Sequence, residues 1–135
     1  YQESVQALAD RWGLGPSEFL FVGHLPWEDL LACYRFSDVF ISMSEHEGFA
    51  VPLVESMLTG LPIMAFAKTA VPDTLGDAGI LFHEKEYDML AEMAYLLTFD
   101  ENLRQAVVKS GSERVKQFHP NRVEAELLRY VEEVC

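Results

Sequence analysis

Short apolar runs alternate with helical patterns along most of the chain. The runs lack the apolar–polar alternation of a half-exposed strand, and continuous apolar runs are typical of strands buried on both faces. We therefore predict four strands, at residues 19–23, 38–43, 61–66 and 78–82. Apolar positions at helical spacing predict helices between them, at residues 3–12, from Pro26, and from Pro52 to Thr59. Strands that alternate with helices predict an α/β fold, with a Rossmann-like parallel sheet and flanking helices.

From Glu86 to the end of the chain the pattern is helical. Its apolar positions form stripes that we expect to face the core: Met89, Leu90, Met93, Leu96 and Leu97, then Leu103, Val107 and Val108, then Val123, Leu127, Leu128, Tyr130 and Val131. Cys33 falls in an earlier apolar helical pattern, so we expect a small core residue. Because Cys33 and Cys135 are far apart, the sequence predicts neither a disulfide scaffold nor a zinc site.

Composition and charge exclude several classes of protein. Half of the 135 residues are hydrophobic and 12% are aromatic, which excludes a disordered chain. The formal net charge of −12 argues against nucleic acid or a membrane surface as the partner, because both are anionic. No apolar run approaches the about 18 residues of a membrane span. No basic segment precedes an apolar stretch as in a signal peptide, so we expect a cytoplasmic location.

Polar and glycine-containing segments follow each predicted strand. They are Gly23-His24, residues 42–48, residues 67–73 and His83-Glu84. Ligands of open parallel sheets bind beyond the carboxyl ends of the strands, so these segments are the first candidates for a site.

The segment from Ser44 to Met57 contains the most informative residues. Glu47 lies in a polar loop and Glu55 lies eight positions later, in the first turns of a predicted helix. Gly48 permits a tight or positive-φ backbone beside a ligand. The N–H groups at the helix start can bind an anion, and a nearby carboxylate can accept hydroxyl donors such as a sugar diol. An anion and a polyol together describe a sugar nucleotide.

Each of these residues also has a simpler interpretation. Alone, Glu47 and Glu55 read as a solvated loop acid and an acid favoured by the helix dipole. Ser44 can cap the loop rather than contact a ligand, and His24 and His46 can be surface residues. Lys68 is the one cation near a strand end in the middle of the chain, and we expect it to face water. Lys85 stands in an acidic run that we expect to be a solvated helix start.

The segment resembles the glutamate-x7-glutamate motif of retaining glycosyltransferases of the GT-B fold, in the group-1 (GT4-like) family. The motif is carried by Glu47-Gly48-Phe49, Val51-Pro52-Leu53, Glu55-Ser56-Met57 and Gly60-Leu61-Pro62-Ile63. Phe21-Val22-Gly23, Tyr34, Ser37-Asp38-Val39-Phe40, Ser44, Ala70-Val71-Pro72-Asp73, Gly76-Asp77-Ala78-Gly79 and Leu81-Phe82 resemble further family elements. The resemblance spans roughly residues 3–119, and several motifs agree in order. Met43 departs from it, standing where the family commonly has Pro.

The resemblance implies a role for each matching residue. Glu55 is similar to the glutamate that binds the ribose hydroxyls, and Glu47 to the catalytic-site glutamate that contacts a donor-sugar hydroxyl near the anomeric carbon. The backbone N–H groups of Gly48, Phe49, Val51 and Leu53 would lie against the sugar and diphosphate. Gly23 and His24 would contact the base, and Ser44 belongs to the family's pro-ser element. The resemblance implies no cofactor and no metal.

We therefore expect residues 1–135 to form a single, partial GT-B C-terminal domain that binds a nucleotide sugar, with a helical segment at 86–135. It would belong to a retaining hexosyltransferase that acts on a nucleoside-diphosphate sugar and an acceptor hydroxyl of a glycan, a lipid or a small molecule. The alternatives are a GT-B-fold sugar-nucleotide epimerase and a non-catalytic interaction module.

The resemblance also implies that the domain's first strands, its Arg and Lys pair for the diphosphate, and the acceptor domain precede Tyr1. We therefore expect this chain alone to be inactive. An exposed strand edge would lead to self-association, to re-pairing of the strands at 19–23 and 38–43, or to marginal stability.

Overall fold

The computed structural model describes residues 2–134, and the side chains of all of these except 126, 127 and 130–134. The chain divides into two compact units, Tyr1–Leu31 and Ala32–Cys135. The prediction of one domain from end to end remains a prediction. Leu127, Tyr130 and Val131, which we assigned to an apolar stripe, lie outside the described side chains.

The first unit consists of helix α1 (Gln2–Arg11), a connecting segment and the first turns of α2 (Trp27–Phe36). Gly13 ends α1 as predicted, with φ +71°, and the next N–H, of Leu14, donates to the carbonyl of Ala9 at 3.0 Å. The helix predicted at residues 3–12 is thus confirmed, and of its apolar residues Ala9 is buried while Leu8 and Trp12 are exposed.

The predicted strand at residues 19–23 is wrong. These residues form an irregular segment, and no ladder joins them to any strand of the described chain. Without a neighbouring strand an apolar run has no partner for its backbone groups, whatever its composition. The rings of Phe19 and Phe21 contact each other edge to face instead, with centroids 5.1 Å apart.

A parallel sheet of three strands organises the second unit. The strands are β1 (Phe40–Ser42), β2 (Ile63–Phe66) and β3 (Ile80–Phe82), in the order β1-β2-β3. Both pairs are parallel. This confirms the predicted α/β fold and three of the predicted strands, although each strand is shorter than its apolar run.

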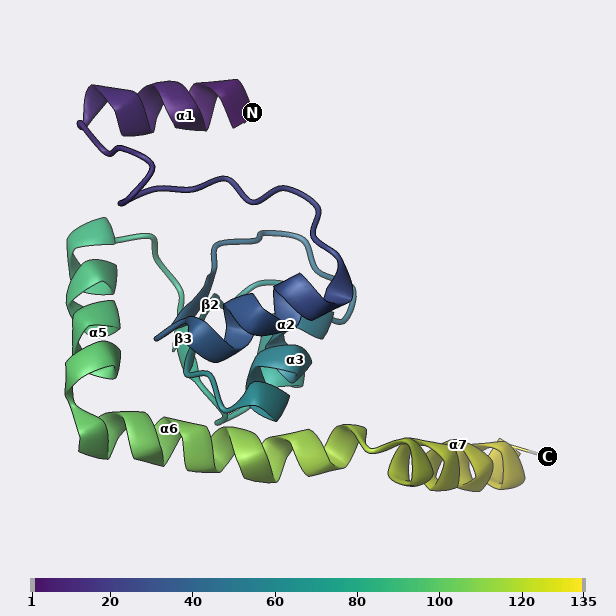
Figure 1. Cartoon of the computed structure of the whole chain (residues 1–135). Coiled ribbons are helices and arrows are strands. Elements are labelled where there is room, and N and C mark those ends of the chain that lie inside the picture. The colour runs from purple at the N-terminus through teal and green to yellow at the C-terminus, as the bar shows by residue number, and fades with distance from the viewer. Residues whose placement is uncertain (1, 135) are drawn as a thin grey trace. The chain divides into compact units, whose positions relative to one another are not determined.

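Helix α2 precedes the first strand and the other helices follow the strands, with one that was not predicted. They are α2 (Trp27–Phe36), α3 (Val51–Thr59), α4 (Val71–Leu75), α5 (Tyr87–Phe99), α6 (Glu101–Arg114), the 3-10 turn η1 (Val115–Phe118) and α7 (Pro120–Val134). Gly60 ends α3 as predicted, with φ +71°. The short helix α4 was not predicted. It has only five residues, one of them Pro72, and this length is too short to show a helical repeat of apolar positions. The predicted helical segment is interrupted at Asp100, between α5 and α6 (Figure 1). The Asp100 carboxylate accepts the Leu103 N–H and caps the start of α6.

Strand β2 lies between two apolar clusters because successive side chains of a strand point to opposite faces. Ile63 and Ala65 pack with Leu53 and Met57 of α3 and with Val71 and Leu75 of α4. Met64 and Phe66 pack with Phe82 of β3 and with Leu90 and Leu97 of α5. Every residue of β2 is buried, which accounts for its continuous apolar sequence.

Some predicted core positions are exposed. Cys33 is a free, exposed cysteine, so the prediction that it is a small core residue is wrong. The buried residue of α2 is Tyr34. Because successive helical side chains point about 100° apart, the neighbouring Cys33 faces away from the core. Met89 and Leu96 of α5 are exposed as well, and the buried residues of that helix are Leu90 and Leu97.

Strand β1 pairs with β2 alone among the described strands, so its other edge has no ladder, and re-pairing with residues 19–23 is not seen. Ile41, at the centre of β1, is 42% exposed. We predict that the chain self-associates through this edge, and that Ile41→Lys weakens the association at least about tenfold, or ~1.4 kcal/mol. Sedimentation across a concentration series measures this.

Leu58→Lys is the matched control, because Leu58 is apolar and exposed but lies on α3. A stable wild-type monomer that resists concentration, or equal effects of the two lysines, would contradict association through β1.

Candidate functional site

The two glutamates lie at the carboxyl edge of the sheet. Glu47 is in the loop that leaves β1, and Glu55 is in the second turn of α3, which that loop enters. Both side chains are half-buried. The loop therefore carries one carboxylate and leads directly to the helix that carries the other, as the motif implies.

Two hydroxyl groups fasten the Glu47 loop to the segment after β2. The Glu47 N–H donates to Thr69 Oγ1 at 2.9 Å. The Thr74 hydroxyl donates to the carbonyl of Phe49 at 2.7 Å. Thr74 is itself held in place on α4, since Arg114 donates to the backbone carbonyls of Thr74 and Asp73. The position of Glu47 thus depends on residues more than twenty positions away.

The site contains the two non-glycine residues of the described chain that have positive φ. Ala50 has φ 59° and ψ 57°, and Thr69 has φ 48°. This conformation is costly for residues with a Cβ, most of all for a β-branched one, and it persists where the surroundings impose it. We had placed the tight turn at Gly48, but Gly48 is not among the positive-φ glycines, and the left-handed residue is Ala50.

The backbone at the start of α3 presents part of the expected anion site. Val51 is the first residue of the helix, and an N–H group there has no partner within the helix. Phe49 is about half exposed and its ring packs on Phe118, with centroids 5.4 Å apart. Leu53 does not fit its predicted role, because its N–H donates to the carbonyl of Ala50 at 2.9 Å and its side chain is 1% exposed. Leu53 belongs to the core, while Gly48, Phe49 and Val51 remain candidates.

Glu55 is hydrogen-bonded to a tyrosine on a different helix. The Tyr34 hydroxyl of α2 donates to Glu55 Oε2 at 2.8 Å. Burial, together with the adjacent carboxylate, raises the pKa of Tyr34 above its ordinary value. From the sequence we had placed Tyr34 in a family motif, without a link to Glu55.

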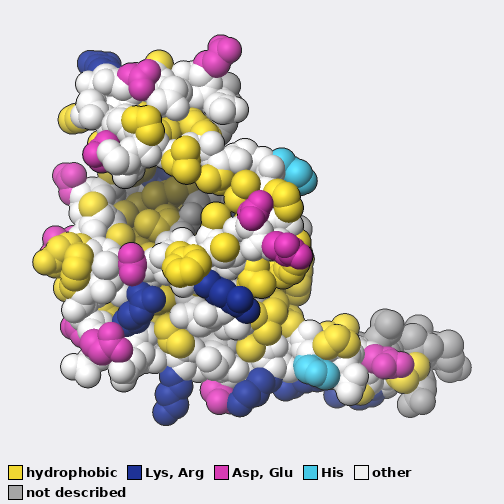
Figure 2. All heavy atoms as spheres, viewed as in Figure 1, with side chains coloured by type: hydrophobic (Ala, Val, Ile, Leu, Met, Phe, Trp, Pro, Cys, Tyr) yellow, Lys and Arg dark blue, Asp and Glu magenta, His cyan; other side chains and the backbone are white. Residues whose placement is uncertain are grey.

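A pair of lysines lies over one aromatic ring at the ends of β2 and β3. Lys85 Nζ is 4.6 Å from the centroid of the Phe66 ring and 2.6 Å from Glu45 Oε1, and Lys68 Nζ is 5.6 Å from the same centroid. The hydrogen bond and charge of Lys85 lower the pKa of Glu45. Lys and Arg side chains lie among hydrophobic ones on the face of the molecule in Figure 2.

Sequence reasoning missed the role of Lys85, which we expected to be solvated. One feature of the sequence could have indicated this ion pair: Glu45 and Lys85 both follow strand ends, and strand ends meet at the same edge of a parallel sheet. Lys68 is exposed, as expected.

The remaining predicted site residues have different surroundings. The Ser44 hydroxyl donates to the carbonyl of His46 at 3.3 Å, so Ser44 closes the loop locally, and a ligand contact for it remains a prediction. Gly23, with φ +63°, and His24 lie in the first unit, whereas the glutamates lie in the second. Their contact with a nucleotide base also remains a prediction.

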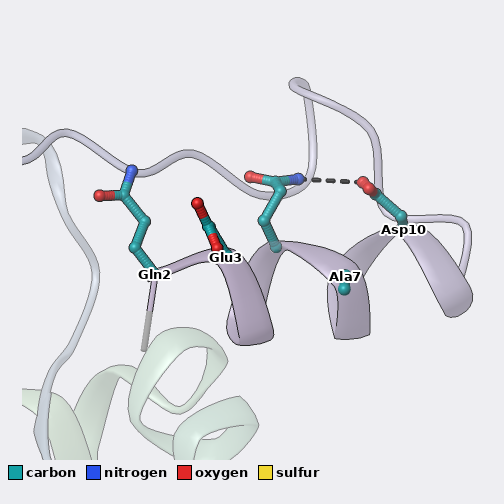
Figure 3. A pocket seen from close by; sticks show the side chains of 5 residues that line it. Gln2, Glu3, Ala7 and Asp10 are labelled. Carbon is teal, nitrogen blue, oxygen red and sulfur yellow. Dashed lines mark hydrogen bonds between the residues drawn. The ribbon is translucent and has the colours of Figure 1, made fainter.

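An open depression runs along α1 in the first unit (Figure 3). It is lined by Gln2, Glu3, Gln6, Ala7 and Asp10. The Gln6 amide donates to Asp10 Oδ1 at 3.0 Å, and the carboxylates of Glu3 and Asp10 make this surface unsuited to an anion.

Among the side chains that the structure describes, no group of three or more His, Cys, Asp or Glu residues is arranged to hold a metal ion. None of the helices in the described part of the chain has the length and hydropathy to cross a membrane.

Comparison with known proteins gives a match over most of the chain. Residues 1–114 match the family model of glycosyl transferases group 1. The chain is 30% identical over 98 residues to O-antigen chain mannosyltransferase B of Escherichia coli, covering 73% of this chain and 26% of that protein. The chain thus spans about a quarter of the length of this relative.

Solved structures share the fold. The C-terminal domain of a group 1 glycosyl transferase from Francisella tularensis matches with a TM-score of 0.72 and 24% identity, over 86% of this chain and 60% of that one. Sucrose-phosphate synthase from Thermosynechococcus elongatus matches with a TM-score of 0.81 and 23% identity, over 98% of this chain and 34% of that one. At this identity the likeness concerns the fold.

Thr69 provides a test of how the Glu47 loop is held. In Thr69→Gly the strained φ is relieved, which stabilises by about 1–2 kcal/mol, while a hydrogen bond of about 0.5–1.5 kcal/mol is lost. We predict little net change in the free energy of unfolding, but about 2- to 10-fold faster hydrogen exchange at the Glu47 amide. Thr69→Ser keeps the hydroxyl and should keep the protection. Unchanged Glu47 exchange in Thr69→Gly would show that Thr69 does not anchor the loop.

Proposed function

Because the chain belongs to the glycosyl transferases group 1 family, we propose that it is the donor-binding part of a retaining glycosyltransferase. The reaction moves a hexose from a nucleoside-diphosphate sugar to an acceptor hydroxyl. The observation that carries the proposal is the juxtaposition described above: a loop glutamate and a helix glutamate flank a helix N-terminus at the carboxyl edge of a parallel sheet.

Each part of the site has a distinct task in this proposal. Glu55 accepts the ribose hydroxyls, and Glu47 accepts a donor-sugar hydroxyl beside the anomeric carbon. The N–H groups around Gly48, Phe49 and Val51 stabilise the negative charge that develops on the leaving diphosphate. Since such donors are fixed before the reaction, they need no reorganisation as the glycosidic phosphate bond breaks. The proposal requires no metal and no cofactor.

The relatives guide the choice of substrate class. The name of the mannosyltransferase relative supports a hexosyl donor, and the acceptor can be a glycan, a lipid or a small molecule. An epimerase of the same fold would also use a ribose-binding carboxylate, but family membership favours transfer. We retain the cytoplasm as the proposed location.

The two glutamates should fail differently in the full-length protein. Ribose is present in every nucleotide ligand, so Glu55→Ala should weaken both the diphosphate and the sugar nucleotide by about 1–3 kcal/mol, or ~5- to ~150-fold. Glu47→Ala should leave diphosphate binding within roughly 0.5 kcal/mol. It should still lower kcat/KM strongly, because its contact lies beside the reacting carbon. Calorimetry with both ligands, together with steady-state kinetics, measures this.

Two outcomes would show that the pair is wrongly assigned. One is an equal loss for both ligands in Glu47→Ala. The other is no loss for either ligand in Glu55→Ala. Glu92→Ala is the matched control, because this carboxylate is exposed on α5 and is given no contact with the donor.

We further predict that the 135-residue chain has no transferase activity by itself. It covers 26% of the mannosyltransferase relative, so most of that relative has no counterpart in this chain. Orientation of two substrates against each other supplies a large part of a transferase's rate, and a donor site alone cannot supply it. Release of nucleoside diphosphate with formation of a glycoside by the purified chain would contradict this prediction.

A further inference from the structure

The contact between Tyr34 and Glu55 has no role in the function proposed so far. We propose that Tyr34 is a positioning residue, whose hydroxyl holds the Glu55 carboxylate with Oε1 directed to the ligand and thereby strengthens the discrimination of ribose from deoxyribose. The inference rests on the proposed function, because it assumes that Glu55 binds ribose.

The Tyr34 ring is the rigid partner in this contact. Tyr34 is 7% exposed, and its ring packs near Phe40, with centroids 6.1 Å apart. A tyrosine has two side-chain torsions and is held here by packing, whereas a glutamate has three torsions and loses more freedom when it is ordered. Because the ring is held by packing, the hydrogen bond of 2.8 Å restricts the side-chain conformations of the half-buried Glu55 carboxylate.

The hydrogen-bonding capacity of Glu55 leaves room for a ligand. An ionised carboxylate has about four acceptor positions, and Tyr34 occupies one of them, on Oε2. No hydrogen bond to Oε1 occurs within the described part of the chain. A ribose diol can therefore donate to Oε1 and to the remaining lone pair of Oε2.

The phenol is also suited to act only as a donor to Glu55. Burial and the Glu55 carboxylate both raise the pKa of Tyr34, so its proton remains in place across the physiological range. Ribose discrimination follows because a nucleotide without the hydroxyls leaves Oε1 of a fixed, half-buried carboxylate without a donor. A site built to hydrogen-bond a hydroxyl strongly rejects the analogue that lacks it, because its polar groups are then left unpaired.

The alternative is that the contact only fastens α2 to α3. Such a role would lower stability without changing the preference for ribose. The two roles therefore differ in one measurable quantity, the ratio of dissociation constants for a 2′,3′-dideoxynucleotide and its ribonucleotide.

The test compares Tyr34→Phe with wild type in the full-length protein. The probes are UDP, GDP and ADP and their 2′,3′-dideoxy counterparts, measured by calorimetry. We expect wild type to prefer at least one ribonucleotide. Tyr34→Phe should reduce that preference about 3- to 10-fold while binding the dideoxynucleotide within about twofold of wild type. In a Glu55→Ala background, Tyr34→Phe should cause no further loss, since Tyr34 acts through Glu55.

Tyr95→Phe is the matched control, because Tyr95 is an exposed tyrosine of α5 whose ring contacts that of Phe99 at a tilt. It should leave the preference unchanged. An unchanged ratio in Tyr34→Phe, or equal losses for both kinds of nucleotide, would overturn the positioning role and leave the proposed function standing. A wild-type full-length protein that binds none of the nucleotides would overturn the proposed function and the inference together.

A second measurement covers the case in which Tyr34→Phe does not fold. With 3-fluorotyrosine incorporated, the tyrosine resonance that moves in Glu55→Ala identifies Tyr34. That resonance should also move when the preferred ribonucleotide is added, and not with its dideoxy counterpart. The same response to both ligands, or to neither, would overturn the inference.

Discussion

Burial of β2 on both faces is the constraint on which the rest of the second unit depends. Ile63 and Ala65 require an apolar layer on one side, and Met64 and Phe66 require one on the other. Helices α3 and α4 supply the first layer and α5 supplies the second. Because crossovers of this kind make the strands parallel, all three strands end at the same edge, and the loops that leave β1 and β2 meet there. The position of the candidate site is thus a consequence of how the core is covered.

At that edge, hydroxyl groups add hydrogen bonds to the apolar packing of Tyr34, Phe49 and Ala50. Thr69 and Thr74 hold the backbone of the Glu47 loop, and Tyr34 holds the Glu55 side chain. Each of these contacts joins segments more than twenty residues apart. The unusual φ values of Ala50 and Thr69 occur in the same segments, which indicates that the long-range contacts outweigh local backbone preference there. A site built in this way is fixed before a ligand arrives, which is the condition for discrimination by hydrogen bonding.

The sequence predicted the α/β class, three strands, the ends of α1 and α3, and the loop with Glu47, because each depends on local patterning or on a short motif. It failed where the outcome depends on partners distant in the chain. The run at 19–23 has strand composition but no ladder, so it forms no strand. The tight turn fell at Ala50 rather than Gly48, because anchoring by Thr69 and Thr74 decides the loop conformation. Leu53 matches the motif, but its N–H donates to the carbonyl of Ala50 and is not free for a ligand. The ion pair between Glu45 and Lys85 joins residues 40 positions apart, and no spacing rule reaches that far.

The net charge of −12 bears on how the proposed site could receive a diphosphate. At physiological ionic strength the Debye length is about 8 Å, so most exposed carboxylates of the chain are screened from the edge of the sheet. What matters is the local balance. There the first N–H groups of α3 carry partial positive charge, and Lys68 and Lys85 lie over Phe66. Glu45 neutralises Lys85, which leaves Lys68 and the start of α3 as the local positive potential. An acidic chain can therefore present an edge that tolerates an anion, while its remaining surface disfavours nucleic acids and anionic membranes.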